Sequence, residues 1–468
     1  MDGQLILNTP HQEGFLERTL LDSNVAADAR AEKLPRRLGL FSAVAVLVGS
    51  TIGSGIFRVP STVAADVGTL GAIALIWIIG ALVALFGALT LAELAAIFPR
   101  SGGIYVFLRE AYGPLPAFLF GWTELLVIRP SALGAISIVF AENAVRVFGM
   151  PDDSARWLAA GAIILLALAN VRSVLWAAGI VNLTTGAKVA ALAAVALIAF
   201  AFGDPAGGAL TQTFGFQPES WGGFGVALIA VLWAYDGWAD LTFVAGEVRD
   251  PQRTMPRALL IGTGLVIVLY LLVNLAYLYV MPIDEMAAST RVAADAASKV
   301  FGAVGASIIA SLVMLSAFGA LSGSTLTGPR ILYAMADDGL FFRPISWVHP
   351  KWQTPYMAIL LTSALGVAYV SVRGFERLAG DFILGIWPFY ALAVGAVFIL
   401  RRRRADLERP YRAAGYPVVT IVFLLASVLM LGNSLLEQTT STLIDFGIIL
   451  IGIPVYALWM RLRSRHDG

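Results

Sequence analysis

The chain has 468 residues, of which 58% are hydrophobic and 13% charged, a composition that excludes a soluble globular domain and is typical of a protein with many membrane-spanning helices. Its formal net charge of +1 gives no indication of nucleic-acid binding, because the arginines are scattered over short loops and form no single basic face. Cysteine is absent, and His11, His349 and His466 lie in tails or a polar loop, so we expect no disulfide, no metal site and no cofactor.

A polar segment comes first, and long apolar runs follow it. Residues 1–37 are mixed in charge and lack the apolar core of a signal peptide, and we interpret them as a cytoplasmic tail. A membrane-spanning helix needs roughly 20 mostly apolar residues. About twelve such runs predict an all-α membrane protein with twelve transmembrane helices, near residues 38–66, 69–98, 115–148, 155–175, 177–203, 221–246, 256–281, 298–336, 355–373, 378–400, 416–437 and 440–462.

The basic residues of the loops predict an orientation, because Lys and Arg in short loops remain on the cytoplasmic side. Arginines occupy alternate loops, at positions 36, 37, 100, 109, 249, 253, 257, 401–404, 461, 463 and 465. The loop over residues 203–220 contains neither Lys nor Arg. We therefore expect an even number of helices with both termini in the cytoplasm. Arg373 and Arg377 lie on the opposite side in this scheme.

Two of the predicted helices are interrupted by glycine and polar residues. The segment "VGSTIGSGIF", residues 48–57, has three glycines and three small hydroxyl residues within seven consecutive positions of the first helix. The segment "WAYDGW", residues 233–238, interrupts the sixth. Because the interruptions are five helices apart, an odd number, corresponding helices of two such halves cross the membrane in opposite directions. This pattern is typical of an inverted repeat.

Unwound backbone inside a membrane indicates a cavity or a site buried in protein, because an unsatisfied N–H or C=O group is costly in lipid. A half-helix that starts near Ser54 presents free N–H groups, which suit a carboxylate. The half-helix that ends near residues 233–235 presents free carbonyl groups, which suit an ammonium group. Together they predict a site for an α-amino acid. The alternative is that the glycines only permit close helix packing, since Gly49 and Gly53 have the small-xxx-small spacing.

Four segments resemble a known group of transporters. "VGSTIGSGIF" is similar to the first-helix motif of the amino acid-polyamine-organocation superfamily, and "PRSGGIYVFLREAYGP", residues 99–114, resembles its re-entrant loop. "ELLVIRPSA", residues 124–132, and "WAYDGWADLTFVAGEVRDPQRTMPRA", residues 233–258, resemble the L-type amino acid transporter branch. The resemblance implies a five-plus-five inverted-repeat fold. It places a transport core over residues 38–400, two further helices over 401–462 and a cytoplasmic tail over 463–468.

The resemblance also implies which residues bind substrate. They are Thr51, Ile52, Gly53, Ser54, Gly55, Trp233, Ala234 and Asp236. Ser54 and Gly55 would donate to the substrate carboxylate, and Thr51 and Ile52 would line the unwound turn. Trp233, Ala234 and Asp236 would offer carbonyl groups to the amine. Trp233 would in addition gate the site, whereas without the resemblance it could equally belong to an interfacial aromatic belt.

Lys188 lies well inside a predicted helix, in "TTGAKVAALAAVALIAF". An ammonium group there is costly and needs a partner. In the family that the chain resembles, a lysine of the fifth helix takes the place of a sodium ion between the first and eighth helices, which implies independence of sodium. The implied partners are carbonyl groups near Gly49 and hydroxyl groups such as that of Ser322. The alternative is that Lys188 extends toward the membrane surface.

Four other intramembrane charges leave alternatives open. Glu124 and Arg129 are five residues apart in one helix, on poorly matched faces, so their spacing does not by itself predict an ion pair. The resemblance implies a structural role for Arg129. Asp236 could pair with a tyrosine or lysine or narrow the side-chain pocket. Asp240 could line the pathway or only face water.

We expect a secondary active transporter that exchanges L-amino acids by alternating access, multi-pass in the inner (cytoplasmic) membrane of a bacterium. A proton symporter is an alternative, because a buried lysine can carry a proton, and a non-transporting receptor is another. A channel or an enzyme is not expected, since the chain has neither repeated filters nor clustered catalytic groups. Animal L-type members bind a heavy chain through a cysteine, so the resemblance implies no disulfide-linked heavy chain here. The expected partners are the amino acid and membrane lipid.

Overall fold

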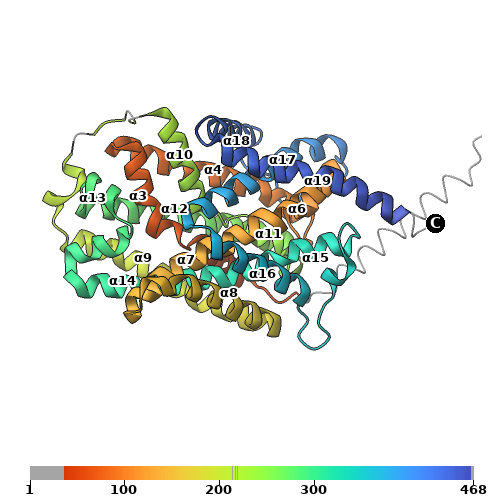
Figure 1. Cartoon of the computed structure of the whole chain (residues 1–468). Coiled ribbons are helices and arrows are strands. Elements are labelled where there is room, and N and C mark those ends of the chain that lie inside the picture. Colours follow the sequence, from red (N-terminus) through yellow and green to blue (C-terminus); the bar gives the residue numbers. More distant parts are fainter. Residues whose placement is uncertain (1–35, 213, 217, 219, 465–468) are drawn as a thin grey trace, which may run out of the picture.

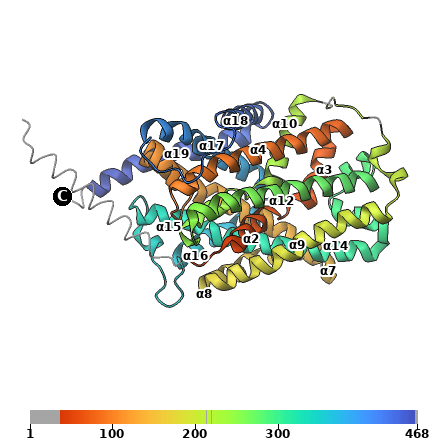
Figure 2. The same cartoon turned by 180° about the vertical axis from the view of Figure 1, so that it is seen from behind.

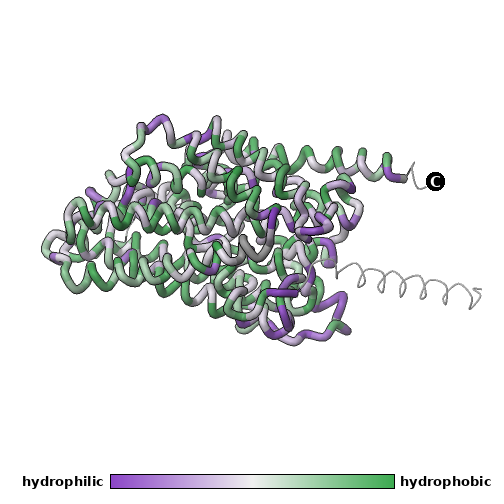
Figure 3. The backbone as a smooth tube through the Cα atoms, turned by 90° about the horizontal axis from the view of Figure 1, so that it is seen from below, coloured by the Kyte–Doolittle hydropathy of each residue, from purple (hydrophilic) through white to green (hydrophobic). Residues whose placement is uncertain are grey.

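The computed structural model describes residues 36–464 except 213, 217 and 219, and most of the described chain is helical. Figure 1 shows the long helices running roughly along the long dimension of the molecule. Hydrophilic residues gather chiefly at the end from which the C-terminus emerges (Figure 3). In the described part of the chain, β-structure is limited to one isolated bridge between Leu38 and Val248. The all-α class predicted from the apolar runs is therefore confirmed.

The helices are labelled as in Figure 1 and follow the chain in this order. They are α2 (Leu40–Thr51), α3 (Gly55–Val67), α4 (Leu70–Ile97), α5 (Ile104–Tyr112), α6 (Pro114–Thr123), α7 (Arg129–Phe148), α8 (Ala155–Arg172), α9 (Val174–Phe202), α10 (Trp221–Tyr235), α11 (Asp240–Phe243), α12 (Pro251–Val280), α13 (Ile283–Ala288), α14 (Val292–Thr327), α15 (Pro329–Asp337), α16 (Tyr356–Val372), α17 (Phe375–Arg403), α18 (Val418–Glu437) and α19 (Thr439–Ser464). A π-helical turn over Glu124–Ile128 joins α6 to α7.

Ten segments of the described chain are long and apolar enough to cross a membrane. They are Leu40–Val67, Leu70–Ile97, Pro114–Phe148, Asp152–Arg172, Gly179–Phe202, Pro251–Val280, Val292–Asp337, Phe375–Arg403, Val418–Glu437 and Thr439–Arg463. The runs predicted at 221–246 and 355–373 correspond to α10 and α16, which are apolar but have only 15 and 17 residues. α10 is short because the chain leaves the helix at Asp236, where ψ is 157°.

Both interruptions predicted from the glycine patches are present. α2 ends at Thr51, and α3 begins at Gly55. α10 ends at Tyr235, and α11 begins at Asp240. Between these two helices Gly237 has a φ of +111°, which favours glycine, and a Cβ atom there would lie 2.7 Å from the backbone nitrogen of Thr51. The two interruptions are therefore in direct contact.

Long helices surround the interrupted ones. α9, α12 and α14 pack against α2, which Figure 2 shows close to α9 and α12. α10 packs against α3, and α7 and α17 contact each other beside them. This packing buries Thr51, Ser54 and Gly55 inside the bundle. Burial in protein is the condition under which non-helical backbone is tolerated at membrane depth.

Arg373 and Arg377, the two exceptions in the predicted orientation, contact the same buried carboxylate. Arg373 forms an ion pair with Asp381, and Arg377 Nε lies 2.7 Å from Asp381 Oδ1. Asp381 is only 1% exposed, so it needs such partners. Both basic residues therefore have a local acidic partner.

Candidate functional site

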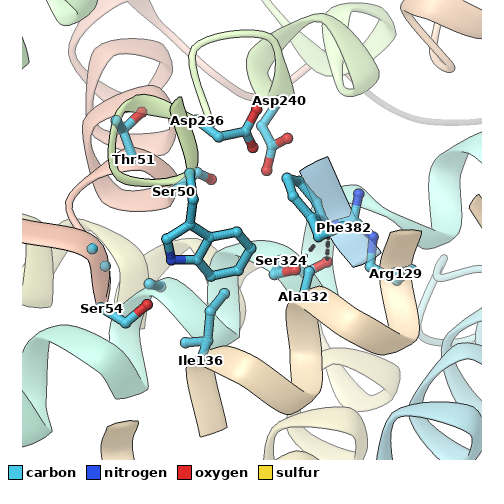
Figure 4. A pocket seen from close by; sticks show the side chains of 15 residues that line it. Ser50, Thr51, Ser54, Arg129, Ala132, Ile136, Asp236, Asp240, Ser324 and Phe382 are labelled. Carbon is cyan, nitrogen blue, oxygen red and sulfur yellow. Dashed lines mark hydrogen bonds between the residues drawn. The ribbon is translucent and has the colours of Figure 1, made fainter. Parts of the chain in front are cut away.

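A cavity lies where the two interruptions meet (Figure 4). It contains about 450 Å³ of empty space, its opening included. Five parts of the bundle contribute its walls: the first interruption, α7, the second interruption, α14 and α17. The lining residues are Ser50, Thr51, Gly53, Ser54, Gly55, Arg129, Ala132, Ile136, Trp233, Asp236, Gly237, Asp240, Ala320, Ser324 and Phe382.

The first interruption supplies hydrogen-bond donors. In the described part of the chain, the backbone N–H groups of Ser54 and Gly55 have no backbone acceptor. They lie at the start of α3, where the helix dipole is positive. A Cβ atom on Gly55 would lie 2.4 Å from the Cα atom of Ala234, so only glycine allows the two interruptions to approach this closely. This corner of the cavity can hold a carboxylate.

Two residues expected to bind substrate do not line this cavity. The carbonyl oxygen of Ile52 accepts hydrogen bonds from Lys188 and Ser316, and Ile52 is not among the residues that line the cavity. Ala234 is also absent from the lining, because it packs against the backbone at Gly55. The six remaining predicted residues all line the cavity: Thr51, Gly53, Ser54, Gly55, Trp233 and Asp236.

Trp233 forms part of the cavity wall against α17. Its ring meets Phe375 and Phe382 edge to face, with centroid distances of 6.1 and 5.0 Å. Only 8% of Trp233 is exposed, which does not fit a residue of an interfacial belt. Its carbonyl oxygen accepts the N–H group of Asp236 at 3.3 Å and is therefore already engaged. The ring, more than the carbonyl group, is what Trp233 presents to the cavity.

Two carboxylates of the second interruption line the cavity. The hydroxyl group of Tyr390 donates to Asp236 Oδ1 at 2.7 Å, so Asp236 pairs with a tyrosine. Thr327 donates to Asp240 Oδ2 at 3.1 Å. Asp240 is only 6% exposed and belongs to the cavity rather than to a water-facing surface. Both carboxylates have free lone pairs, and they make this wall attractive to a positively charged group.

Arg129 faces these carboxylates from α7. Its Nε atom lies 2.6 Å from Glu124 Oε1, and a terminal nitrogen donates to Ser324 Oγ at 2.7 Å. Glu124 and Arg129 meet because Glu124–Ile128 is a π-helical turn, in which residues five apart are neighbours. Gly328 leaves room for this pair, since a Cβ atom there would lie 2.0 Å from Arg129 Nε.

Sequence reasoning missed several lining residues. The resemblance implies a structural role for Arg129, which nevertheless lines the cavity, and lining the pathway is one of the two alternatives for Asp240. The lining residues that the sequence did not indicate are Ser50, Ala132, Ile136, Gly237, Ala320, Ser324 and Phe382. Ser324 lies in the small and polar run "SGSTLTG", residues 322–328, whose composition is a usable signal within an apolar helix. Apolar residues such as Phe382 give no such signal, because a ring that lines a cavity looks the same in sequence as one that packs in the core.

Lys188 lies on α9 behind the first interruption. Its Nζ atom is 2.9 Å from the carbonyl oxygen of Gly49 and 2.6 Å from that of Ile52. Lys188 is only 2% exposed, so it does not extend toward the membrane surface. It instead holds the carbonyl groups at the C-terminal end of α2, where the helix dipole is negative.

Ser322, which was expected beside the ammonium group, does not contact it. The Ser322 hydroxyl has no hydrogen-bond partner among the residues that the structure describes. Ser316, about two turns earlier in α14, donates instead to the carbonyl oxygen of Ile52 at 3.2 Å. The site around Lys188 therefore joins α2, α9 and α14, but through Ser316 and not through Ser322.

Comparisons with known proteins find a family model and several relatives that cover most of the chain. Residues 38–459 match the family model described as amino acid permease. The serine/threonine exchanger SteT of Bacillus subtilis (strain 168) is 32% identical over 428 residues, which cover 90% of this chain and 96% of the relative. The b(0,+)-type amino acid transporter 1 of Mus musculus is 32% identical over 445 residues, 94% of this chain and 91% of the relative. The cystine/glutamate transporter of Homo sapiens is 29% identical over 435 residues, with 92% and 86% covered.

Proposed function

We propose that this chain, which belongs to the amino acid permease family of the amino acid-polyamine-organocation superfamily, exchanges one L-amino acid for another by alternating access and without sodium. The observation that carries the proposal is the cavity between the two interruptions, which has N–H donors at one corner and carboxylates at the other. An α-amino acid has the complementary pair of charges. The relatives are transporters rather than enzymes, as expected for this chain.

The complete fold that we propose has twelve crossings, with the first ten arranged as a five-plus-five inverted repeat. The short apolar helices α10 and α16, added to the ten long segments, give twelve crossings. The transport core then covers residues 38–400, two helices cover 401–462, and the tails cover 1–37 and 463–468. The arginine distribution supports tails on the cytoplasmic side of a bacterial inner membrane. The 468 residues include no cysteine, so we propose that no heavy chain is attached by a disulfide.

In the proposed complex, the N–H groups of Ser54 and Gly55 bind the substrate carboxylate, with Thr51 and Gly53 beside them. The substrate ammonium group lies toward Asp236 and Asp240. Glu124 neutralises Arg129 by forming an ion pair with it. The two carboxylates of Asp236 and Asp240 then outnumber the one guanidinium group that lines the cavity, which favours a substrate with a free ammonium group. Trp233 lies over the substrate and gates it by moving against Phe375 and Phe382.

Lys188 supports sodium independence. Its ammonium group occupies the point where carbonyl oxygens of α2 converge and where Ser316 of α14 approaches. Carbonyl and hydroxyl oxygens are ligands that a sodium ion would also use. A fixed ammonium group in that place supplies the same positive charge without an ion.

Proton symport is the second candidate, and one observation favours it. Lys188 is buried, and among the described residues no carboxylate pairs with it. Carbonyl oxygens hold this ammonium group without a full negative charge beside it, so Lys188 is suited to release a proton during the cycle.

Flux into liposomes tests the function. Purified protein is reconstituted, and uptake of labelled serine is measured with and without internal serine, in sodium and in choline buffer, and with an imposed pH gradient. Exchange predicts uptake only with internal amino acid and equal rates in both buffers. Uptake into empty liposomes that requires the pH gradient would establish symport instead. Binding of amino acids without any flux would indicate a receptor.

A further inference from the structure

A second cavity lies between α9, α12 and α14 and shares no lining residue with the substrate cavity. It contains about 510 Å³ of empty space, its opening included. Aliphatic side chains of α9 and α14 form most of its wall, and Tyr277 of α12 is the one lining residue with a polar side chain. Phe301 and Ile308 at its edge are 48% and 56% exposed, so the cavity opens on the apolar outer surface of the bundle.

A bend in α14 lies beside this cavity. Gly302 departs from helical geometry, with φ 60° and ψ −149° inside α14. A Cβ atom on Gly305 would lie 2.6 Å from the carbonyl oxygen of Ala297, so the two parts of α14 touch closely at the bend. Phe301 and Gly305, on either side of Gly302, both line the cavity.

The hydroxyl group of Tyr277 is unusual for a buried polar group. Tyr277 is 0% exposed, and among the described residues its hydroxyl has no hydrogen-bond partner. Burying a hydroxyl group without a hydrogen bond costs free energy, and buried polar groups in native proteins rarely lack a hydrogen-bond partner. Tyr277 lines the cavity, which is therefore the side from which an acceptor outside the chain can approach its side chain. A water molecule needs two to four polar partners and would find only one polar side chain.

The depth of the cavity indicates what kind of acceptor is available. Tyr277 precedes the end of α12 at Val280 by three residues, and the lining residue Ala199 precedes the end of α9 at Phe202 by three. α12 has 30 residues and is roughly 45 Å long, whereas the hydrocarbon core of a bilayer is about 30 Å thick. A helix of this length reaches beyond the hydrocarbon core, so we place the last turn of α12 near the boundary between acyl chains and headgroups, where the ester carbonyl groups of phospholipids lie.

We propose that this cavity binds one acyl chain of a membrane phospholipid and that the Tyr277 hydroxyl donates to its ester carbonyl group. The aliphatic wall matches the chain, and the ester supplies the acceptor that Tyr277 lacks. Near the same end of α14, Lys299 pairs with Glu285 at 2.5 Å. Neighbouring positive and negative side chains complement the phosphate and ammonium groups of a zwitterionic headgroup.

Photo-crosslinking of the full chain tests the site. The protein is reconstituted with phosphatidylethanolamine that has a diazirine on one acyl chain near the ester, and the cross-linked peptides are mapped. We expect cross-links concentrated in residues 195–199 and 296–309, and Ala199→Leu, which fills the cavity, should reduce them at least threefold. Ala194→Leu, on the exposed face of α9, is the matched control and should leave the yield unchanged. Equal yields in the two variants, or labelling spread evenly over the bundle, would overturn the proposal.

Substitution of Tyr277 tests the hydrogen bond. Tyr277→Phe removes no protein partner and should therefore fold normally. Wild-type protein should prefer diester over diether phospholipid by about two- to tenfold, the value of one hydrogen bond. Tyr277→Phe should lose this preference, while Tyr279→Phe on the same helix should keep it. If the wild-type protein bound diester and diether phospholipid equally well, the hydrogen bond assigned to Tyr277 would be contradicted. Full displacement of the phospholipid by an equal amount of free fatty acid would also contradict it.

Discussion

Gly55 lies where the backbone of α10 passes the start of α3. Because a Cβ atom there would be 2.4 Å from the Cα atom of Ala234, Gly55→Ala must separate the two interruptions. The N–H donors and the carboxylates would then no longer fit one amino acid. We expect at least about tenfold weaker binding, or roughly 1.4 kcal/mol, in a scintillation proximity assay of the purified protein.

Gly161→Ala is the matched control for that substitution. Gly161 is also a glycine of a long apolar helix, α8, but a Cβ atom there would have nothing within 4 Å. Its alanine variant should bind like the wild type. Unchanged affinity in Gly55→Ala as well would mean that the close contact at Ala234 does not shape the site.

Lys188 contacts the end of α2 but does not line the substrate cavity. Lys188→Ala should therefore impair the movement of α2 relative to α9 more than it impairs binding. Two hydrogen bonds from a charged donor are lost, so we expect exchange to slow at least about tenfold, while the dissociation constant changes less than about threefold. Lys351→Ala, in an exposed loop, controls for loss of a positive charge. Unchanged turnover in Lys188→Ala would leave Lys188 with a purely structural role.

Single residues show where sequence reasoning reaches its limit. The contact of Lys188 with Gly49 was predicted, because a buried ammonium group must find acceptors and the end of an interrupted helix supplies them. Ser322 was predicted in place of Ser316 because sequence fixes neither the rotation of α14 nor its displacement along α2. That rotation also depends on the bend at Gly302, which interrupts the helical phase.

At the scale of elements, the π-helical turn before α7 determines which residue pairs with Arg129. An α-helix places residues three and four apart on one face. The spacing of five between Glu124 and Arg129 therefore does not predict an ion pair in a regular helix. The π-helical turn brings residues five apart together. Nothing in "ELLVIRPSA" distinguishes such a turn from regular helix, so the pair could be found only in the structure.

Ion pairs join three elements beyond the cavity. Arg58 of α3 lies 2.7 Å from Glu142 of α7 and 2.6 Å from Glu376 of α17. Because these helices also supply cavity residues, we expect the contacts to restrict access from this end. Arg58→Gln should increase the labelling rate of Ala132→Cys in the cavity by about two- to fivefold, given that partly exposed pairs contribute up to about 1 kcal/mol.

The labelling experiment is well controlled, because the chain has no cysteine of its own. A membrane-impermeant thiol reagent is added to the Ala132→Cys protein with and without Arg58→Gln. Arg156→Gln, in the first turn of α8, removes an exposed guanidinium group that belongs to neither pair and should not change the rate. A rate that stays constant in Arg58→Gln would show that the ion pairs do not control access.

At the scale of the whole molecule, the orientation follows from where arginine is absent. The loop over residues 203–220 should face outward, and the loop over residues 338–355 should face the cytoplasm. In intact cells, Ala206→Cys should react with the impermeant reagent and Lys351→Cys should not, unless the membrane is opened. Both positions are exposed, so burial cannot protect them. Labelling of Lys351→Cys alone would invert the proposed orientation.

The positions of the helix interruptions could be predicted from the sequence, whereas the packing of the other helices around them could not. The interruptions were correctly located, because glycine and hydroxyl residues unwind a membrane helix wherever they lie. Six of the eight predicted substrate residues line the cavity for the same reason. The contributions of Arg129, Ser324 and Phe382 depend on how α7, α14 and α17 pack around the interruptions. That packing is set by side-chain shapes over the whole bundle, which one sequence does not reveal.

The central claim is that an amino acid lies between the two interruptions with its carboxylate at the start of α3. An experimental structure of the protein in lipid nanodiscs, compared with and without saturating serine, tests it most directly. We predict additional density next to the backbone nitrogens of Ser54 and Gly55, with its opposite end toward Asp236. Density for serine elsewhere in the bundle, with this cavity unchanged between the two maps, would contradict the claim.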